Sequence, residues 1–465
     1  MNSERGPCAR KDSLRPDSPG MLMMKERLLQ ERMIAEGGFR VRRALLLAAS
    51  FHLAATVGVY LTGRLGLLPS VFDRSGIGLF ASDSLHYQSQ AGALADTLKT
   101  QGLTAWLAAY LPVHVKLYSL SFALLGPLLG NNILAAEPLN LLYYLATLCL
   151  VFKIAAESFD RRAGLLAAGI VGLWPSLLLH GTQMLREQLF IAVTLAPVLI
   201  LTRLLNRAYT WRRGLAASLA GTSVLAAAWL VRAESWGLVR AAVFLTACLF
   251  VVRTLRERRP AAGNVLCVSV LLLVAWAVPQ VAAKLAGVPG VRPGVSAEQR
   301  SLPAWAVIAK RRQQFIKEST ESNALSNIDT EVEFQNAGDV LRHVPRAAVV
   351  GFFAPFPRMW FDTGGFVGRS GRLLAGAETF LTYVIELLVV AALVKRRNSL
   401  SAWLLFLTAA AGVTALGMVV INVGTLYRMR YTFWVMLVVL GAEGLRQVSG
   451  EVAARRARAS AAVAK

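Results

Sequence analysis

Two acidic residues stand where long apolar runs of the sequence end. Asp83 follows the first long apolar run, and Glu187 lies in a polar turn between two later runs. A carboxylate is costly to hold beside lipid, so an acid at the edge of a membrane is a candidate functional residue. Such a group could remove a proton from a hydroxyl, or could bind the hydroxyl or a metal ion. We therefore take Asp83 and Glu187 as candidate catalytic residues.

Basic residues stand at the same ends of the apolar runs. Arg428 and Arg430 come just before the last run. A guanidinium group presents paired N–H donors that match the oxygens of a phosphate or pyrophosphate. The other ionisable side chains expected on this side of the membrane are His86, His114, Lys116, Arg186, Arg232 and Glu234. We expect all these groups to line a water-facing cavity at the outer leaflet.

Acids and arginines in one cavity match the chemistry of a sugar activated on a lipid phosphate. The leaving group is an anion that must be stabilised at the membrane surface, and the acceptor hydroxyl must lose a proton. Simpler interpretations exist, since Asp83 could be a helix N-cap and Glu187 an ion-pair partner. The two late arginines could be anchors in the interface. Positive residues are disfavoured on the outer side of a membrane, however, and this favours a function for them.

The composition predicts a polytopic α-helical membrane protein. Of the 465 residues, 55% are hydrophobic and only 17% are charged, and the mean hydropathy is +0.50. A soluble domain normally carries about 25% charged residues. Apolar runs long enough to cross a membrane recur along the chain, bounded by arginine clusters. The net charge of +23 lies mainly in short loops, where it sets topology, and therefore does not indicate binding to nucleic acid.

The basic clusters predict ten spans, with both termini in the cytoplasm. The predicted spans are 44–62, 133–152, 163–181, 188–205, 214–231, 237–252, 263–283, 376–394, 401–421 and 430–446. The apolar piece 115–129 is too short for a hydrocarbon core of about 30 Å, so we expect it to lie on the outer face or to dip into it. If it crossed, the clusters at 153–162 and 203–213 would lie outside, against the positive-inside rule. The piece 347–356 is interrupted by proline and should not cross either.

These spans divide the chain into five parts. They are a polar cytoplasmic tail (1–43), an N-terminal membrane module (44–283) with the first external loop at 63–132, a long external loop with amphipathic helices (284–374), C-terminal membrane helices (375–446) and a basic cytoplasmic tail (447–465). Outside the spans we expect a short surface helix at 22–35 and amphipathic helices at 85–98 and 303–317. In this plan every candidate residue lies at the outer face.

At these residues the sequence resembles the GT-C superfamily of glycosyltransferases that use polyprenyl-phosphate sugars. The resemblance is to bacterial proteins related to dolichyl-phosphate-mannose protein mannosyltransferases and aminoarabinose transferases. The stretch 83–87, Asp-Ser-Leu-His-Tyr, resembles the acid and tyrosine in the first external loop of those enzymes. The stretch 111–118 resembles a second motif and keeps its proline, lysine and tyrosine, but not its Pro-Pro pair. The stretches 174–188, 354–357 and 424–430 are also similar, whereas a single acid stands where the mannosyltransferases have an Asp-Glu pair.

The resemblance implies an all-α, GT-C-like bundle in a bacterial plasma membrane, with external interfacial helices. It implies an inverting transfer of a hexosyl or pentosyl sugar from a polyprenyl-phosphate donor to an acceptor hydroxyl at the outer face. Asp83 would be the general base or would orient the acceptor, and Glu187 would be a supporting acid. The contacts to the donor phosphate would be Lys116, Arg428 and Arg430. Supporting residues would be His86, Tyr87, His114, Arg186, Arg232 and Glu234. The partners are then the lipid-linked sugar and membrane lipid; the acceptor and any divalent cation stay open.

Two other functions fit parts of the sequence. An O-antigen-type polymerase or ligase also uses external arginines, but would not depend on the first-loop acid in the same way. A lipid or sugar transporter would show internal repeats and helices broken near the middle of the membrane. Prolines 175, 197 and 279 interrupt apolar runs at unmatched depths, and no repeat is visible. The sequence therefore favours the glycosyltransferase.

Overall fold

The computed structural model is helical throughout the part of the chain that it describes. The described residues are 19–81, 83–257, 261–284, 302–321, 326–362 and 368–463. Within them, seven segments are long and apolar enough to cross a membrane. The number becomes eight if α5 (Arg161–Gly172) and α6 (Pro175–Gly181), which meet at a bend of 66°, form one broken span. The protein is therefore a polytopic helical membrane protein, as its apolar runs predicted.

The spanning helices lie where apolar runs were predicted to cross. They are the 41–64 part of α1 (Pro19–Arg64), α4 (Ile133–Ser158), α7 (Arg186–Asn206), α8 (Trp211–Arg232), α9 (Trp236–Glu257), α10 (Ala262–Lys284), α14 (Gly368–Lys395) and α15 (Leu400–Val419). Helices α8 and α9 are joined by one short 3-10 turn and count together as one of the seven segments. The predicted span 430–446 lies within α16 (Val423–Val463), which is not one of the seven among the described helices. Glu443 and Arg446 lower the hydropathy of that stretch.

Helix α1 differs from its prediction. We expected a short surface helix at 22–35 separate from the first span, but the helix runs unbroken for 46 residues. No proline stands between positions 20 and 64, so no backbone donor is missing along this length. The chain divides into two compact units, Met1–Phe51 and His52–Lys465, and every candidate residue belongs to the second.

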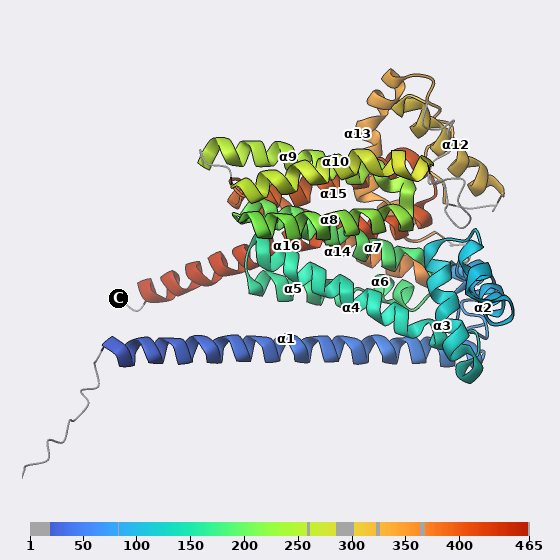
Figure 1. Cartoon of the computed structure of the whole chain (residues 1–465), viewed down its shortest axis with the longest axis horizontal. Coiled ribbons are helices and arrows are strands. Elements are labelled where there is room, and N and C mark those ends of the chain that lie inside the picture. Colours follow the sequence, from blue (N-terminus) through green and yellow to red (C-terminus); the bar gives the residue numbers. More distant parts are fainter. Residues whose placement is uncertain are drawn as a thin grey trace, which may run out of the picture. The chain divides into compact units, whose positions relative to one another are not determined.

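Besides α5, α6 and α16, four described helices of the second unit are not among the seven spanning segments. They are α2 (Asp83–Ala108), α3 (Val113–Leu129), α12 (Ala304–Glu321) and α13 (Ala337–Phe353). In Figure 1 they lie toward the same end of the bundle. Helix α3 has only 17 residues, in keeping with the expectation that this apolar piece does not cross. Helix α2 continues well beyond the predicted 85–98 and bends at Gly102, whose φ of 83° suits glycine.

Three contacts fix the position of α16, which carries both late arginines. Helix α16 packs closely on α14 at Gly444, where an added Cβ would lie 2.0 Å from the Leu388 carbonyl oxygen. Before α16 begins, Val423 N donates to Ser326 O at 2.9 Å, and Ile328 N donates to Ile421 O at 3.0 Å. The 326–328 segment is therefore paired with the turn that leads into α16.

Candidate functional site

Asp83, Glu187 and Arg428 meet in space, although Asp83 and Arg428 are 345 positions apart in the chain. Arg428 Nη2 donates to Asp83 Oδ2 at 2.6 Å, and Arg428 Nε lies 3.6 Å from Glu187 Oε1. These residues lie near the N-terminal ends of α2, α7 and α16. The two acids therefore open on the same side of the bundle and share one guanidinium group.

The two acids differ sharply in exposure. The Asp83 side chain is 47% exposed, whereas that of Glu187 is only 6% exposed. Both stand in the first turn of a helix, where the free backbone N–H groups stabilise a negative charge. Glu187 Oε2 makes no hydrogen bond within the described residues. Asp83 can thus meet a molecule arriving from water, while Glu187 acts from within the protein.

Arg428 is held in its charged form by these acids. Burial lowers the pKa of its guanidinium group, but Glu187 and Asp83 together outweigh that effect and raise the pKa. An arginine that stays charged in a partly dry site is a strong donor for an oxyanion. The same residue therefore has the position and charge to bind phosphate.

Several predicted supporting residues surround this cluster. The positive charges of Arg186 and Arg232 stabilise the Glu187 carboxylate, and the negative charge of Glu234 stabilises both arginines. The Arg232 guanidinium carbon lies 4.9 Å from the centre of the Phe190 ring. The cluster thus contains two further cations besides Arg428, each balanced in part by an acid.

The α2 and α3 residues supply an aromatic side to the cluster. Burial raises the pKa of the Tyr87 hydroxyl, which therefore stays protonated and can donate a hydrogen bond. The His114 ring lies edge-on to Tyr87, with ring centres 4.5 Å apart. His86 Nε2 lies 2.9 Å from Gln90 Nε2, on the exposed surface of α2. Tyr87 and His114 border the cluster, whereas the contact of His86 is within its own helix.

Lys116 is not brought to this cluster. Its ammonium donates to Leu107 O at 2.9 Å and lies 5.6 Å from the Trp106 ring centre. Burial lowers its pKa, and its contacts are with the last turn of α2 rather than with the acids or Arg428. The Lys116 side chain therefore contacts α2, and not the residues with which it was expected to bind the donor phosphate.

Arg430 also has other contacts than the predicted ones. It is buried, and its Nη1 donates to three carbonyl oxygens: those of Gly351 at 3.2 Å, Phe352 at 2.7 Å and Ala354 at 2.9 Å. The last carbonyl groups of a helix have no partner within it, and Arg430 supplies one for the end of α13. Its contacts are those of a structural cap rather than of a phosphate ligand.

Replacement of Arg430 by methionine should therefore lower the free energy of unfolding, by about 2–4 kcal/mol, because two buried carbonyl groups and one half-buried carbonyl group lose their donor. Thermal unfolding of the purified protein in detergent measures this loss. The control is Arg397→Met. It changes an exposed arginine just after the C-terminal end of α14 and should leave the melting temperature unchanged. Unchanged stability of Arg430→Met together with lost binding of lipid phosphate would restore the phosphate-binding interpretation.

The sequence did not point to Gln183, which joins the two loops that carry the acids. Its Oε1 accepts from Gly78 N at 2.8 Å, and its Nε2 donates to Gly76 O at 3.4 Å. Gln183 is fully buried and lies four residues before Glu187, while the glycines precede Asp83. In the sequence, only its place in the polar stretch 180–188 suggests a role for Gln183. That place does not reveal that its partners are Gly76 and Gly78.

The sequence also did not point to Arg312, which joins the segment 329–332 to the chain just before α16. It is 2% exposed; its Nε donates to Val332 O at 3.0 Å and its Nη1 to Met418 O at 2.9 Å, and Nη2 bonds to Asp329 O. Met418 lies at the end of α15, just before the turn into α16. Arg312 therefore helps to set the position from which Arg428 reaches the acids.

The described residues contain no group of three histidine, cysteine, aspartate or glutamate side chains placed to hold a metal ion. The carboxylates of Asp83 and Glu187 converge instead on the Arg428 guanidinium. The chemistry that these contacts support is therefore proton acceptance by an acid and anion binding by an arginine.

No family model and no curated protein matches the sequence. Among solved structures, the oligosaccharyltransferase of Archaeoglobus fulgidus in its apo form matches 90% of this chain and 52% of its own, at 16% identity and a TM-score of 0.50. The oligosaccharyltransferase AglB of that organism, in complex with an inhibitory peptide and a dolichol-phosphate, matches 88% and 52%, at 14% identity and a TM-score of 0.44. The chain spans about half the length of these structures. The first likeness shows that this chain shares its helical fold with the matched half of that structure.

Proposed function

We propose that this protein is a membrane glycosyltransferase that moves a sugar from a polyprenyl-phosphate donor to an acceptor hydroxyl. The observation that carries the proposal is the contact of Arg428 with both Asp83 and Glu187 at the ends of three helices. A fold shared with an oligosaccharyltransferase supports the same class of reaction. The proposed topology has ten spans, both termini in the cytoplasm of a bacterial cell and the site at the outer face.

In the proposed reaction the acceptor oxygen attacks the anomeric carbon of the donor sugar, with inversion. The bond from that carbon to the phosphate oxygen breaks, and the electron pair leaves with the lipid phosphate. Asp83, which is 47% exposed, takes the proton of the acceptor hydroxyl. Arg428 stabilises the charge that develops on the phosphate.

Donor binding would also prepare the base. Arg428 Nη2 donates a hydrogen bond to Asp83 Oδ2 at 2.6 Å. A phosphate oxygen offers this donor a second anionic partner, while Glu187 continues to hold the Nε side of the same group at 3.6 Å. When the phosphate takes Nη2, Asp83 loses its partner and becomes available to accept a proton. The base is then free only when the donor is bound.

The direct test is to incubate the purified protein in liposomes with a panel of radiolabelled polyprenyl-phosphate sugars and a membrane extract. Transfer of label from one donor to an acceptor is the expected result, with Asp83→Asn protein as the inactive control. Transfer from lipid-pyrophosphate sugars alone would favour the polymerase or ligase. Movement of labelled lipid across the bilayer without transfer would favour a transporter.

A further inference from the structure

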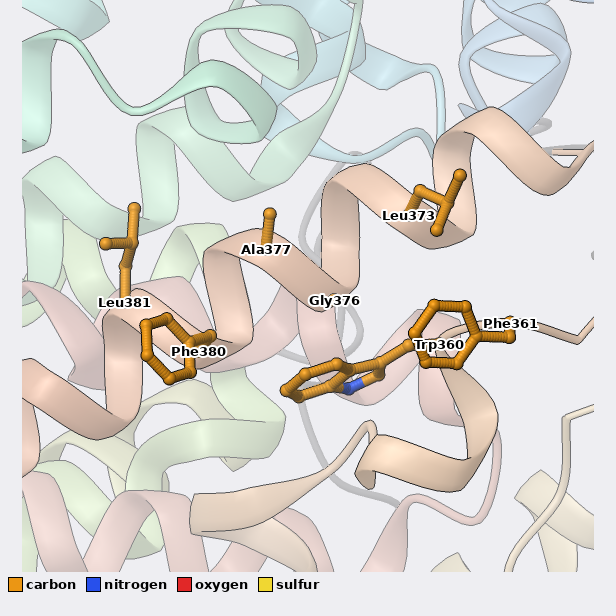
Figure 2. Close-up of a pocket in the computed structure, with 7 residues that line it drawn as sticks. All are labelled: Trp360, Phe361, Leu373, Gly376, Ala377, Phe380 and Leu381. Carbon is orange, nitrogen blue, oxygen red and sulfur yellow. The ribbon is translucent and has the colours of Figure 1, made fainter.

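An open apolar groove lies between α14 and the chain segment that follows α13. Its volume is about 450 Å³, and it is lined by Trp360, Phe361 and the outward-facing residues of α14 from 373 to 381. Figure 2 shows the Trp360 and Phe361 rings lying along this stretch of α14. Gly376 makes room for the Trp360 ring, since an added Cβ would lie 2.7 Å from Trp360 Cγ. We propose that this groove binds the acyl chain of an anionic phospholipid.

The groove faces away from the site of the proposed reaction. Glu378 on α14 is 2% exposed, accepts a hydrogen bond from Ser176 N at 2.7 Å and is bonded to the Tyr427 hydroxyl beside Arg428. Phe380, which lines the groove, is 58% exposed. Residues two apart on a helix point in nearly opposite directions. A lipid in the groove is thus separated from Arg428 by α14 itself, which favours a second, non-reacting lipid over the sugar donor.

Three arginines mark where the lipid head group would lie. Arg369 is exposed and precedes Leu373 by four residues, so it continues the groove-facing side of α14. Arg358 is exposed, two residues before Trp360. Arg372 Nη1 donates to Met359 O at 3.4 Å, which ties α14 to this segment.

The local charge favours an anionic lipid over a neutral one. The sequence from 357 to 372 contains these three arginines and a single acid, Asp362, so this stretch carries a net positive charge. Guanidinium groups bind phosphate through paired N–H donors. An exposed apolar groove with cations at one end matches a lipid whose chain and charged head must both be bound.

The experiment counts lipids retained by the full chain in native mass spectrometry after exchange into phosphatidylglycerol, phosphatidylcholine or polyprenyl phosphate. We expect one retained phosphatidylglycerol, preferred over phosphatidylcholine by about tenfold. Two variants should each abolish that preference: Ala377→Phe, which fills the groove, and Arg369→Gln, which removes a cation. The matched control is Leu387→Phe, which enlarges a 72% exposed residue of α14 outside the groove.

Equal retention of the two phospholipids, or equal retention by all variants, would overturn the proposal. So would a groove that takes only polyprenyl phosphate, because the site would then belong to the sugar donor. Melting temperatures of the variants identify any that fail to fold, and the two variants act through different chemistry. Because lipid retention is measured without sugar transfer, the outcome is independent of the proposed function.

Discussion

Replacement of Asp83 by asparagine is expected to reduce sugar transfer by about 10²–10⁴-fold, the range typical for loss of a general base. Asparagine has nearly the same size and can still accept a hydrogen bond from Arg428, but it cannot take up the acceptor proton. Initial rates at varied donor concentration measure the effect. The fall should appear in kcat, and the KM for the donor should change less than about threefold, because the donor phosphate is bound by arginine.

The matched control is Asp96→Asn, which removes an exposed acid on the same helix. It should transfer at the rate of the unchanged protein. Stability should barely differ for either variant, since an ion pair with a half-exposed partner contributes about 0–1 kcal/mol. Full activity of Asp83→Asn would remove this residue from the reaction and would favour the polymerase or ligase, which would not depend on it in the same way.

The helical fold could be predicted because the signal for a membrane helix is local. An apolar run of sufficient length, with arginines at its ends, contains most of the information needed. The amphipathic helix predicted at 303–317 is present as α12, Ala304–Glu321, for a similar reason. The surface helix at 22–35 was wrongly separated from the first span, because the polar composition of this region says little about where a helix ends.

The contacts within the site depend on the tertiary structure and are less accessible to prediction. The acids and arginines could be assigned to one side of the membrane, but not to particular partners. Arg428 and Arg430 show why. Two positions apart on a helix, their side chains point about 160° apart, so only one of them can face the acids. The predicted span began at 430, whereas α16 begins at Val423 and includes both residues.

Replacement of Arg428 by glutamine should lower both the rate of sugar transfer and the stability of the fold. Glu187 is 6% exposed and would lose its nearest cation, and Asp83 would lose a hydrogen bond of 2.6 Å. Breaking a buried pair by removing one partner costs about 3–5 kcal/mol, and Arg186 and Arg232 should hold the loss near the lower end. Sugar transfer should fall by at least about 10³-fold, because a donor aimed at the developing anion is removed.

The double variant Glu187→Gln/Arg428→Gln separates the loss of stability from the loss of sugar transfer. With the buried acid neutralised, the melting temperature should recover most of the way, since the two substitutions are coupled by about 1–3 kcal/mol. Transfer should stay lost, because no guanidinium remains at the position of Arg428. The Arg428→Lys variant should keep the fold but recover only part of the rate, since lysine lacks the planar fork that binds Asp83 and Glu187 through separate nitrogens. If the double variant regained transfer, Arg428 would serve only to balance Glu187, and the donor phosphate would have to be bound elsewhere.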